Sequence, residues 1–316
     1  MAAWSRIITM AMVAASLWIG GPARADGTAD LNACYDANNR RDYDQAIKLC
    51  GRAAQSGGLS DSDAATALND QGMAYSAKGD DDRAIASFAQ AIKLKPDYAD
   101  AYFDRAMALE GKDAYDRAIA DYSKSIELSP DDATAHYYRG SDRILVGQYT
   151  EALTDFDQAA QLNADYAGIA SWSKGIALVN LGRFAEAIPM ISTYLAVKPQ
   201  FHFGGLWLYL AEAGAGRDPK PNLTARFRKA DLSRWPGPLV ALYLGTATAD
   251  AVRAAAKQGD PDYLDIQACQ AAFYIGALEQ ISGKAENARR DLTAAATTCP
   301  KSSFERPSAQ VLLDRK

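Results

Sequence analysis

Apolar and small residues recur along this chain at helical spacing, in consecutive blocks of 34 or 35 residues. Each block predicts two amphipathic helices, with small residues at the eighth and twentieth positions, where the helices must touch. Proline closes most blocks because it cannot continue the second helix. Four consecutive blocks show the pattern: Leu68, Gly72, Tyr75, Gly79, Ala84, Phe88, Ala91 and Pro96; then Tyr102, Ala106, Leu109, Asp113, Ala118, Tyr122, Ser125 and Pro130; then His136, Gly140, Arg143, Gly147, Ala152, Phe156, Ala159 and Ala164; then Ser171, Gly175, Leu178, Gly182, Ala187, Ile191, Tyr194 and Pro199.

This period and spacing resemble the tetratricopeptide repeat (TPR). The resemblance implies an all-α fold, a helix-turn-helix solenoid that winds as a right-handed superhelix with a concave surface. We expect five units over residues 26–201, the first and weaker of them at 27–60. A last unit is expected within 263–302, its frame running over 269–302, and a C-terminal capping helix over 303–316.

The repeat frame also predicts how the four cysteines pair. Cys34 and Cys50 face each other across the helix pair of the first unit, and Cys269 and Cys299 lie at the same end of the last hairpin. We therefore expect disulfides between Cys34 and Cys50 and between Cys269 and Cys299, each stapling a terminal unit that lacks a neighbour. The alternative is four buried, unpaired thiols.

The segment 201–218 begins like another repeat and then breaks at Gly214, Gly216 and Pro219. Its apolar run is too short to span a membrane. We expect the first helix of a unit whose partner is replaced by a loop and small helices, within an irregular helical region over 202–262. Two of these helices are expected at 239–245 and 249–257.

The order of repeats, then "LWLYLAE", "RWPGPLVALYLG" and "AAFYIGALEQISGKAENARRDL", resembles the NlpI family of periplasmic lipoproteins. That resemblance implies a homodimeric scaffold that brings peptidoglycan endopeptidases to a tail-specific protease. Unlike those lipoproteins, this chain has no cysteine directly after its signal sequence. A soluble relative that binds protein or peptide clients is therefore expected, with a tail-specific protease or peptidoglycan hydrolase as candidate partner and a homodimer as candidate assembly.

Residues 1–25 have the composition of a secretory signal peptide. An apolar run over 7–21 follows Arg6, and Ala23 and Ala25 are the small residues that a signal peptidase reads. Cleavage after Ala25 would give a periplasmic or secreted chain without stable membrane insertion. Losing Arg6 and Arg24 would change the net charge from −5 to −7, so general attraction to nucleic acid is not expected.

No catalytic, cofactor-binding or metal-binding motif is found, and we expect a protein that is not an enzyme. His136 falls on a packing position and is interpreted as a core or half-buried residue. His202 would cap the helix that follows it or be exposed. Arg143 stands where sister units have Tyr75, Leu109 and Leu178, so it must reach solvent or meet an acidic partner.

The resemblance to TPR units implies that the second, fifth, ninth and twelfth positions of each first helix point into the groove. No basic residue occupies those positions, so we expect the groove to bind an apolar or aromatic segment of a protein. Alternatively, the next unit or the C-terminal helix covers these aromatic residues. The predicted groove comprises Asn69, Met73, Phe103, Met107, Glu110, Tyr137, Ser141, Ile144, Trp172 and Ile176.

The leading hypothesis is a periplasmic adaptor that takes part in envelope or peptidoglycan homeostasis by presenting clients to a protease or hydrolase. One alternative is a glycan-binding or peptidoglycan-binding module in which Phe103, Tyr137 and Trp172 stack on sugar rings. Another is a structural assembly factor.

Overall fold

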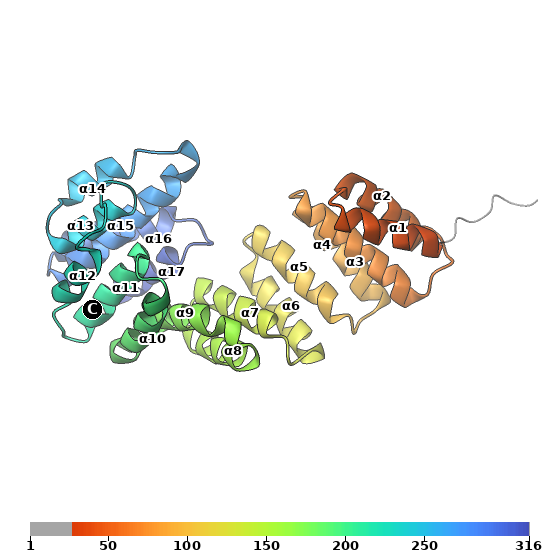
Figure 1. The fold of residues 1–316 in the computed structure, drawn as a ribbon, viewed down its shortest axis with the longest axis horizontal. Helices are drawn as coiled ribbons and strands as arrows, with labels where there is room; N and C mark the ends of the chain where they lie inside the picture. Colours follow the sequence, from red (N-terminus) through yellow and green to blue (C-terminus); the bar gives the residue numbers. More distant parts are fainter. Residues whose placement is uncertain (1–26, 316) are drawn as a thin grey trace, which may run out of the picture.

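The computed structural model describes residues 27–315, and the predicted signal peptide lies outside the described residues. The described residues form α-helices and two short 3-10 helices, with no strand among them. The first ten helices stack as five antiparallel pairs along the long axis of the molecule (Figure 1). These are α1 (Gly27–Asn39), α2 (Tyr43–Gln55), α3 (Asp61–Ala77), α4 (Asp81–Leu94), α5 (Ala99–Gly111), α6 (Tyr115–Leu128), α7 (Ala133–Leu145), α8 (Tyr149–Leu162), α9 (Ala167–Asn180) and α10 (Phe184–Val197).

The remaining helices gather at the other end of the molecule (Figure 1). The helix α11 packs on α10 as the first helix of a sixth pair would, but short helices follow it in place of a long partner. A final hairpin of α15 and α16 comes next, and α17 packs on both of its helices. The bounds are α11 (His202–Gly214), α12 (Lys220–Phe227), α13 (Gly237–Leu244), α14 (Ala249–Ala255), α15 (Leu264–Ile281), α16 (Ala285–Thr298) and α17 (Glu305–Asp314).

The small residues at the eighth position let the two helices of a pair approach closely, as predicted. A Cβ atom added to Gly72 would stand 2.5 Å from the Phe88 ring, and one added to Gly175 would stand 2.4 Å from Ile191 Cγ1. Both distances are too short for a side chain, so the second helix occupies the space that the glycine leaves. The repeat pattern is therefore a packing pattern, and it sets the geometry of each pair.

A second recurring position sets the turn between the paired helices. Gly79, Gly147 and Gly182 have φ angles of 75°, 82° and 74°, in the left-handed region that glycine adopts without steric cost. Asp113 holds the same position with a φ of 55°. The turn therefore keeps one conformation in all four units, although only three of them have the favoured residue.

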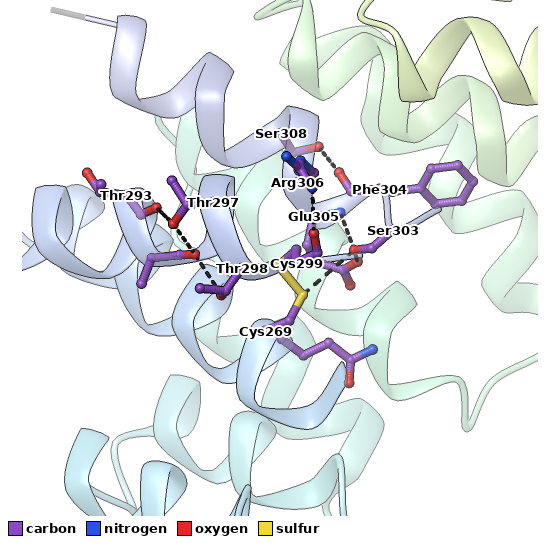
Figure 2. The surroundings of a disulfide bond; sticks show 12 residues. Cys269, Thr293, Thr297, Thr298, Cys299, Ser303, Phe304, Glu305, Arg306 and Ser308 are labelled. Atoms are coloured by element: carbon purple, nitrogen blue, oxygen red, sulfur yellow. Dashed lines mark hydrogen bonds between the residues drawn. A yellow bond between two sulfur atoms is a disulfide. The ribbon is translucent and has the colours of Figure 1, made fainter. Parts of the chain in front are cut away.

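Both predicted disulfides are present. Cys34 Sγ lies 2.02 Å from Cys50 Sγ, and Cys269 Sγ lies 2.09 Å from Cys299 Sγ. Figure 2 shows the second bond joining α15 to the residue after α16, beside the loop that leads into α17. The two bonds therefore lie at opposite ends of the helical stack.

The last helix ties the end of the chain back to the repeats. The Asn180 side chain donates to Ser308 Oγ at 3.0 Å, and the Arg315 guanidinium donates to the carbonyls of Val179 and Asn180 at 2.6 and 2.9 Å. The last carbonyls of a helix have no partner within it. The Gly182 N–H donates to the Val179 carbonyl at 3.0 Å, and Arg315 adds a second donor there and a donor to Asn180. The helix α17 thus covers the inner side of α9 and also contacts α7.

Within residues 27–315, no helix combines the length and the apolar character that crossing a bilayer requires.

Candidate functional site: the concave face

The ninth positions of successive units differ in exposure along the stack. Met73 and Met107 keep 40% and 43% of their surface exposed, whereas Ser141 is half-buried and Ile176 is fully buried. The change comes at α9, against which α11 and α17 pack. The inner face is therefore open at the second and third units and closed at the fifth.

The prediction of an open groove is wrong for four of its ten residues: Asn69, Ile144, Trp172 and Ile176 are buried. The Trp172 ring lies 5.7 Å from that of Tyr194 and 5.0 Å from that of Phe201, centroid to centroid, so the start of the next helix covers it. The Asn69 amide is buried for another reason, since its Nδ2 donates to Asp104 Oδ2 of the next unit at 2.8 Å. The alternative interpretation, coverage by a neighbouring unit, holds for Trp172.

Four of the other predicted residues line one pocket of about 570 Å³: Met107, Glu110, Tyr137 and Ser141. Residues of α5 and α7 form its floor, and the loop before α17 supplies a wall through Ser302 and Phe304. Figure 2 shows Phe304 projecting away from the Cys269–Cys299 disulfide. The pocket is thus built from two distant parts of the chain, and Phe103 and Met73 lie outside its lining.

The loop wall is held in place by a short series of bonds around the disulfide (Figure 2). The Ser303 hydroxyl donates to Glu305 Oε2 at 2.5 Å, and Arg306 Nη1 donates to the Cys299 carbonyl at 3.0 Å. The Ser308 hydroxyl donates to the Phe304 carbonyl at 2.7 Å. One of these hydrogen bonds is made to Cys299, which follows α16 and is held by the disulfide. The position of Phe304 therefore depends on α16 as well as on α17.

Among the described residues that line the pocket, Glu110 and Asp142 are acidic and none is Lys or Arg. The Tyr122 hydroxyl donates to Glu110 Oε1, which lowers the pKa of Glu110, but burial is the larger effect and raises it. Burial raises the pKa of Asp142 to about 8, and the nearby Glu110 carboxyl adds to the rise. These carboxyls therefore lie in a site that disfavours negative charge while nothing positive is bound.

Asp142 is one of the pocket residues that the groove prediction missed. It holds the tenth position of its first helix, where the sister units have the buried alanines Ala74, Ala108 and Ala177. A carboxyl at an alanine position was visible in the repeat alignment and could have identified it. Tyr138 and Phe304 were also missed, because neither occupies an expected groove position.

Arg143 has an acidic partner. Its Nη1 lies 2.6 Å from Asp155 Oδ2, and Arg139 Nη2 lies 2.6 Å from Asp155 Oδ1. Arg105 and Asp121, which lie 2.7 Å apart, form the pair equivalent to Arg139 and Asp155 one unit earlier. These ion pairs join the two helices of a unit, so Arg143 has a structural role and does not line the pocket.

The two histidines have structural surroundings. His136 is buried and its Nε2 lies 3.2 Å from the Pro130 carbonyl, as its packing position predicted. His202 is half-buried and is the first residue of α11, whose capping position is held by Phe201. Its ring stacks on Phe227 with centroids 5.0 Å apart. Among residues 27–315, no group of histidine, cysteine and carboxylate side chains has a metal-binding arrangement.

A stack of antiparallel helix pairs with a partly open inner face defines the class of helical repeat proteins. The sequence model of the tetratricopeptide repeat matches residues 35–98, 69–133 and 139–200, just over half of the chain. The chain belongs to the tetratricopeptide repeat family.

Solved structures of TPR proteins share the fold. A tetratricopeptide repeat protein from Parabacteroides merdae ATCC 43184 is similar over 92% of this chain and 99% of its own, with 14% identity and a TM-score of 0.55. YrrB, titled a TPR protein with an unusual peptide-binding site, covers 57% of this chain and 90% of its own, with 19% identity and a TM-score of 0.51. MamA covers 54% and 91%, with 21% identity and a TM-score of 0.50.

Proposed function

We propose that this protein is a non-enzymatic adaptor that binds a segment of a client protein on the inner face of units two to four. The carrying observation is the pocket that joins α5 and α7 to the loop before α17, flanked by the exposed Met107. Methionine side chains adapt to varied partners, and exposed apolar groups on a concave face favour protein binding. Peptide binding by a TPR protein of this fold, YrrB, supports the same class of partner.

We further propose that the adaptor works in the periplasm and presents clients to a tail-specific protease or a peptidoglycan hydrolase. The signal-peptide pattern of residues 1–25 and the resemblance to NlpI support this role. Two disulfides are also typical of an oxidising compartment. We also propose that the protein forms a homodimer, and only the resemblance to NlpI supports this.

The test is capture of partners from envelope extract by the immobilised chain from residue 26 onward. Tyr137→Ala with Met107→Ala should reduce capture of the specific partner about tenfold or more, because truncating contact residues in a pocket removes hot-spot contacts. Val197→Ala, a similar truncation of an exposed residue on α10, is the matched control. Equal capture by the pocket variant and the control would reject the pocket as the docking site.

Co-sedimentation with purified peptidoglycan separates the adaptor from the glycan-binding alternative. Burial of Trp172 removes one of the three rings proposed to stack on sugars. Sedimentation that needs no protein partner and is lost in Tyr137→Ala would favour the glycan-binding alternative.

A further inference from the structure

The pocket on the inner face contains a carboxyl group that has no partner among residues 27–315. Asp142 is only 2% exposed, and its Oδ2 accepts no hydrogen bond. Within residues 27–315 its carboxylate forms no ion pair with Lys, Arg or His at 4.0 Å or less. A buried polar group without a partner is costly to keep, so its presence points to a partner that arrives from outside.

The comparison among repeats shows that packing does not require this carboxyl. The same position is filled by the buried alanines Ala74, Ala108 and Ala177. Ala108, for example, lies in one apolar cluster with Ala84 and Phe88 of the preceding unit. Two buried carboxyls of neighbouring helices, Asp121 and Asp155, each bind an arginine of their own unit. Asp142 therefore differs both from its sister residues and from the buried acids beside it.

The surroundings of Asp142 suit a cation on an aliphatic stem. Glu110 of α5 lines the same pocket, so the pocket contains two carboxyl groups. The rings of Tyr137, Tyr138 and Phe304 also line it, and aromatic faces attract ammonium and guanidinium groups. Leu145 and Met107 supply apolar surface for methylene groups.

We propose that this pocket binds the side-chain cation of a lysine or arginine of the client segment, with Asp142 as its ion-pair partner. The inference rests on the proposed function, because the cation is delivered by a protein segment lying on the inner face. Binding gives the Asp142 carboxylate the partner that it lacks in the free protein, and the charge-assisted contact selects basic segments over purely apolar ones.

The experiment selects short random peptides from a displayed library on the immobilised chain and then compares two synthetic peptides. The first is a selected sequence and the second is its twin, in which norleucine replaces the basic residue and keeps the stem without the charge. Affinities are measured by calorimetry for the unchanged chain, Asp142→Ala, Asp142→Asn and Asp131→Asn. Asp131 is exposed on the turn before α7 and is the control for loss of one negative charge.

The selected peptides should share a basic residue, and the unchanged chain should bind the basic peptide about tenfold or more tightly than its twin. That preference should disappear in both Asp142 variants and persist in Asp131→Asn. Selected peptides without a basic residue, or a preference that survives Asp142→Ala, would overturn the inference and leave the adaptor proposal standing. A chain that selects no peptide would overturn both. Circular dichroism spectra check that each variant is folded, which Asp142→Ala should be because alanine is the sister residue.

Discussion

The two ends of this molecule bury apolar residues in different ways. Units one to three have small separate clusters, such as Ala106, Leu109, Ala118 and Tyr122 in the third unit. From Ile144 to Ala309, by contrast, one continuous cluster runs through α7 to α17. A helix pair in the first region packs on its neighbours, whereas α7 and α9 in the second region also contact α17, more than a hundred positions later in the sequence. The same repeat position therefore has different surroundings in the two regions.

The largest expected effect comes from the fifth position. Trp172→Ala should lower the free energy of unfolding by ~4 kcal/mol, because a large buried ring leaves a cavity when truncated. Phe103→Ala, at the same position in the open region, should cost less because its side chain is only partly buried. Urea denaturation measures both variants. Equal losses would mean that coverage by the C-terminal region contributes nothing at this position.

The disulfides offer the next comparison. Replacing either cysteine pair with serine should cost ~3 kcal/mol by the loop-closure model. The two variants should differ in how much of the chain exchanges its amide hydrogens faster. Loss of Cys34–Cys50 should speed exchange only in α1 to α3, whereas loss of Cys269–Cys299 should speed it as far as α7 and α9, which α17 contacts. A similarly local response at both ends would contradict the continuous core.

The pH dependence of stability tests the acidic pocket. The folded pKa of Asp142, about 8, lies above the unfolded value of 3.8, so the folded chain binds the proton more tightly. Stability should therefore fall as pH rises from 4 to 8. Asp142→Ala should remove part of this slope and gain ~2 kcal/mol at the alkaline end. Thermal melts across that range measure it, and a variant with an unchanged slope would argue against the raised pKa.

The smallest expected effect is at an exposed residue of the ninth position. Met107→Ser should change stability by less than ~0.5 kcal/mol, as surface substitutions do. Ile176 holds the equivalent position of the fifth unit and is fully buried, so Ile176→Ser should lower the free energy of unfolding several times more. The ratio between the two variants measures how strongly the C-terminal region closes the inner face. A ratio near one would mean that the face is equally open at both units.

The sequence predicted whatever depends on contacts within one unit or between neighbours. Gly72 and Gly175 identified the close approach of paired helices, and the frame paired Cys269 with Cys299 correctly. The frame failed for Trp172 and Ile176, because α9 is covered by the start of α11 and by α17. The helix α17 follows an irregular region without repeat periodicity, so no position within a unit carries information about its coverage of α9.

The pocket shows the same division between local and distant information. Met107, Glu110, Tyr137 and Ser141 were predicted from their positions in the repeat. Phe304 could not be, because it reaches the pocket through a loop fixed by Cys299 and Ser303. Asp142 was predictable only in part. The sequence shows a carboxyl at a position where the sister units have alanine, but only the structure shows that this carboxyl lines the pocket.

The contact between Asn180 and Ser308 joins residues 128 positions apart in the sequence and gives the chain an order of folding. Helices α1 to α6 pack mainly on their near neighbours in sequence, so they can form as soon as they leave the ribosome. The helix α9 reaches its final surroundings only after α17 has followed. Until then the apolar sides of α9, α11 and α15 face water together, and the partly emerged chain is at its most vulnerable to aggregation and proteolysis. The last dozen residues thus set the moment at which the whole C-terminal half becomes stable.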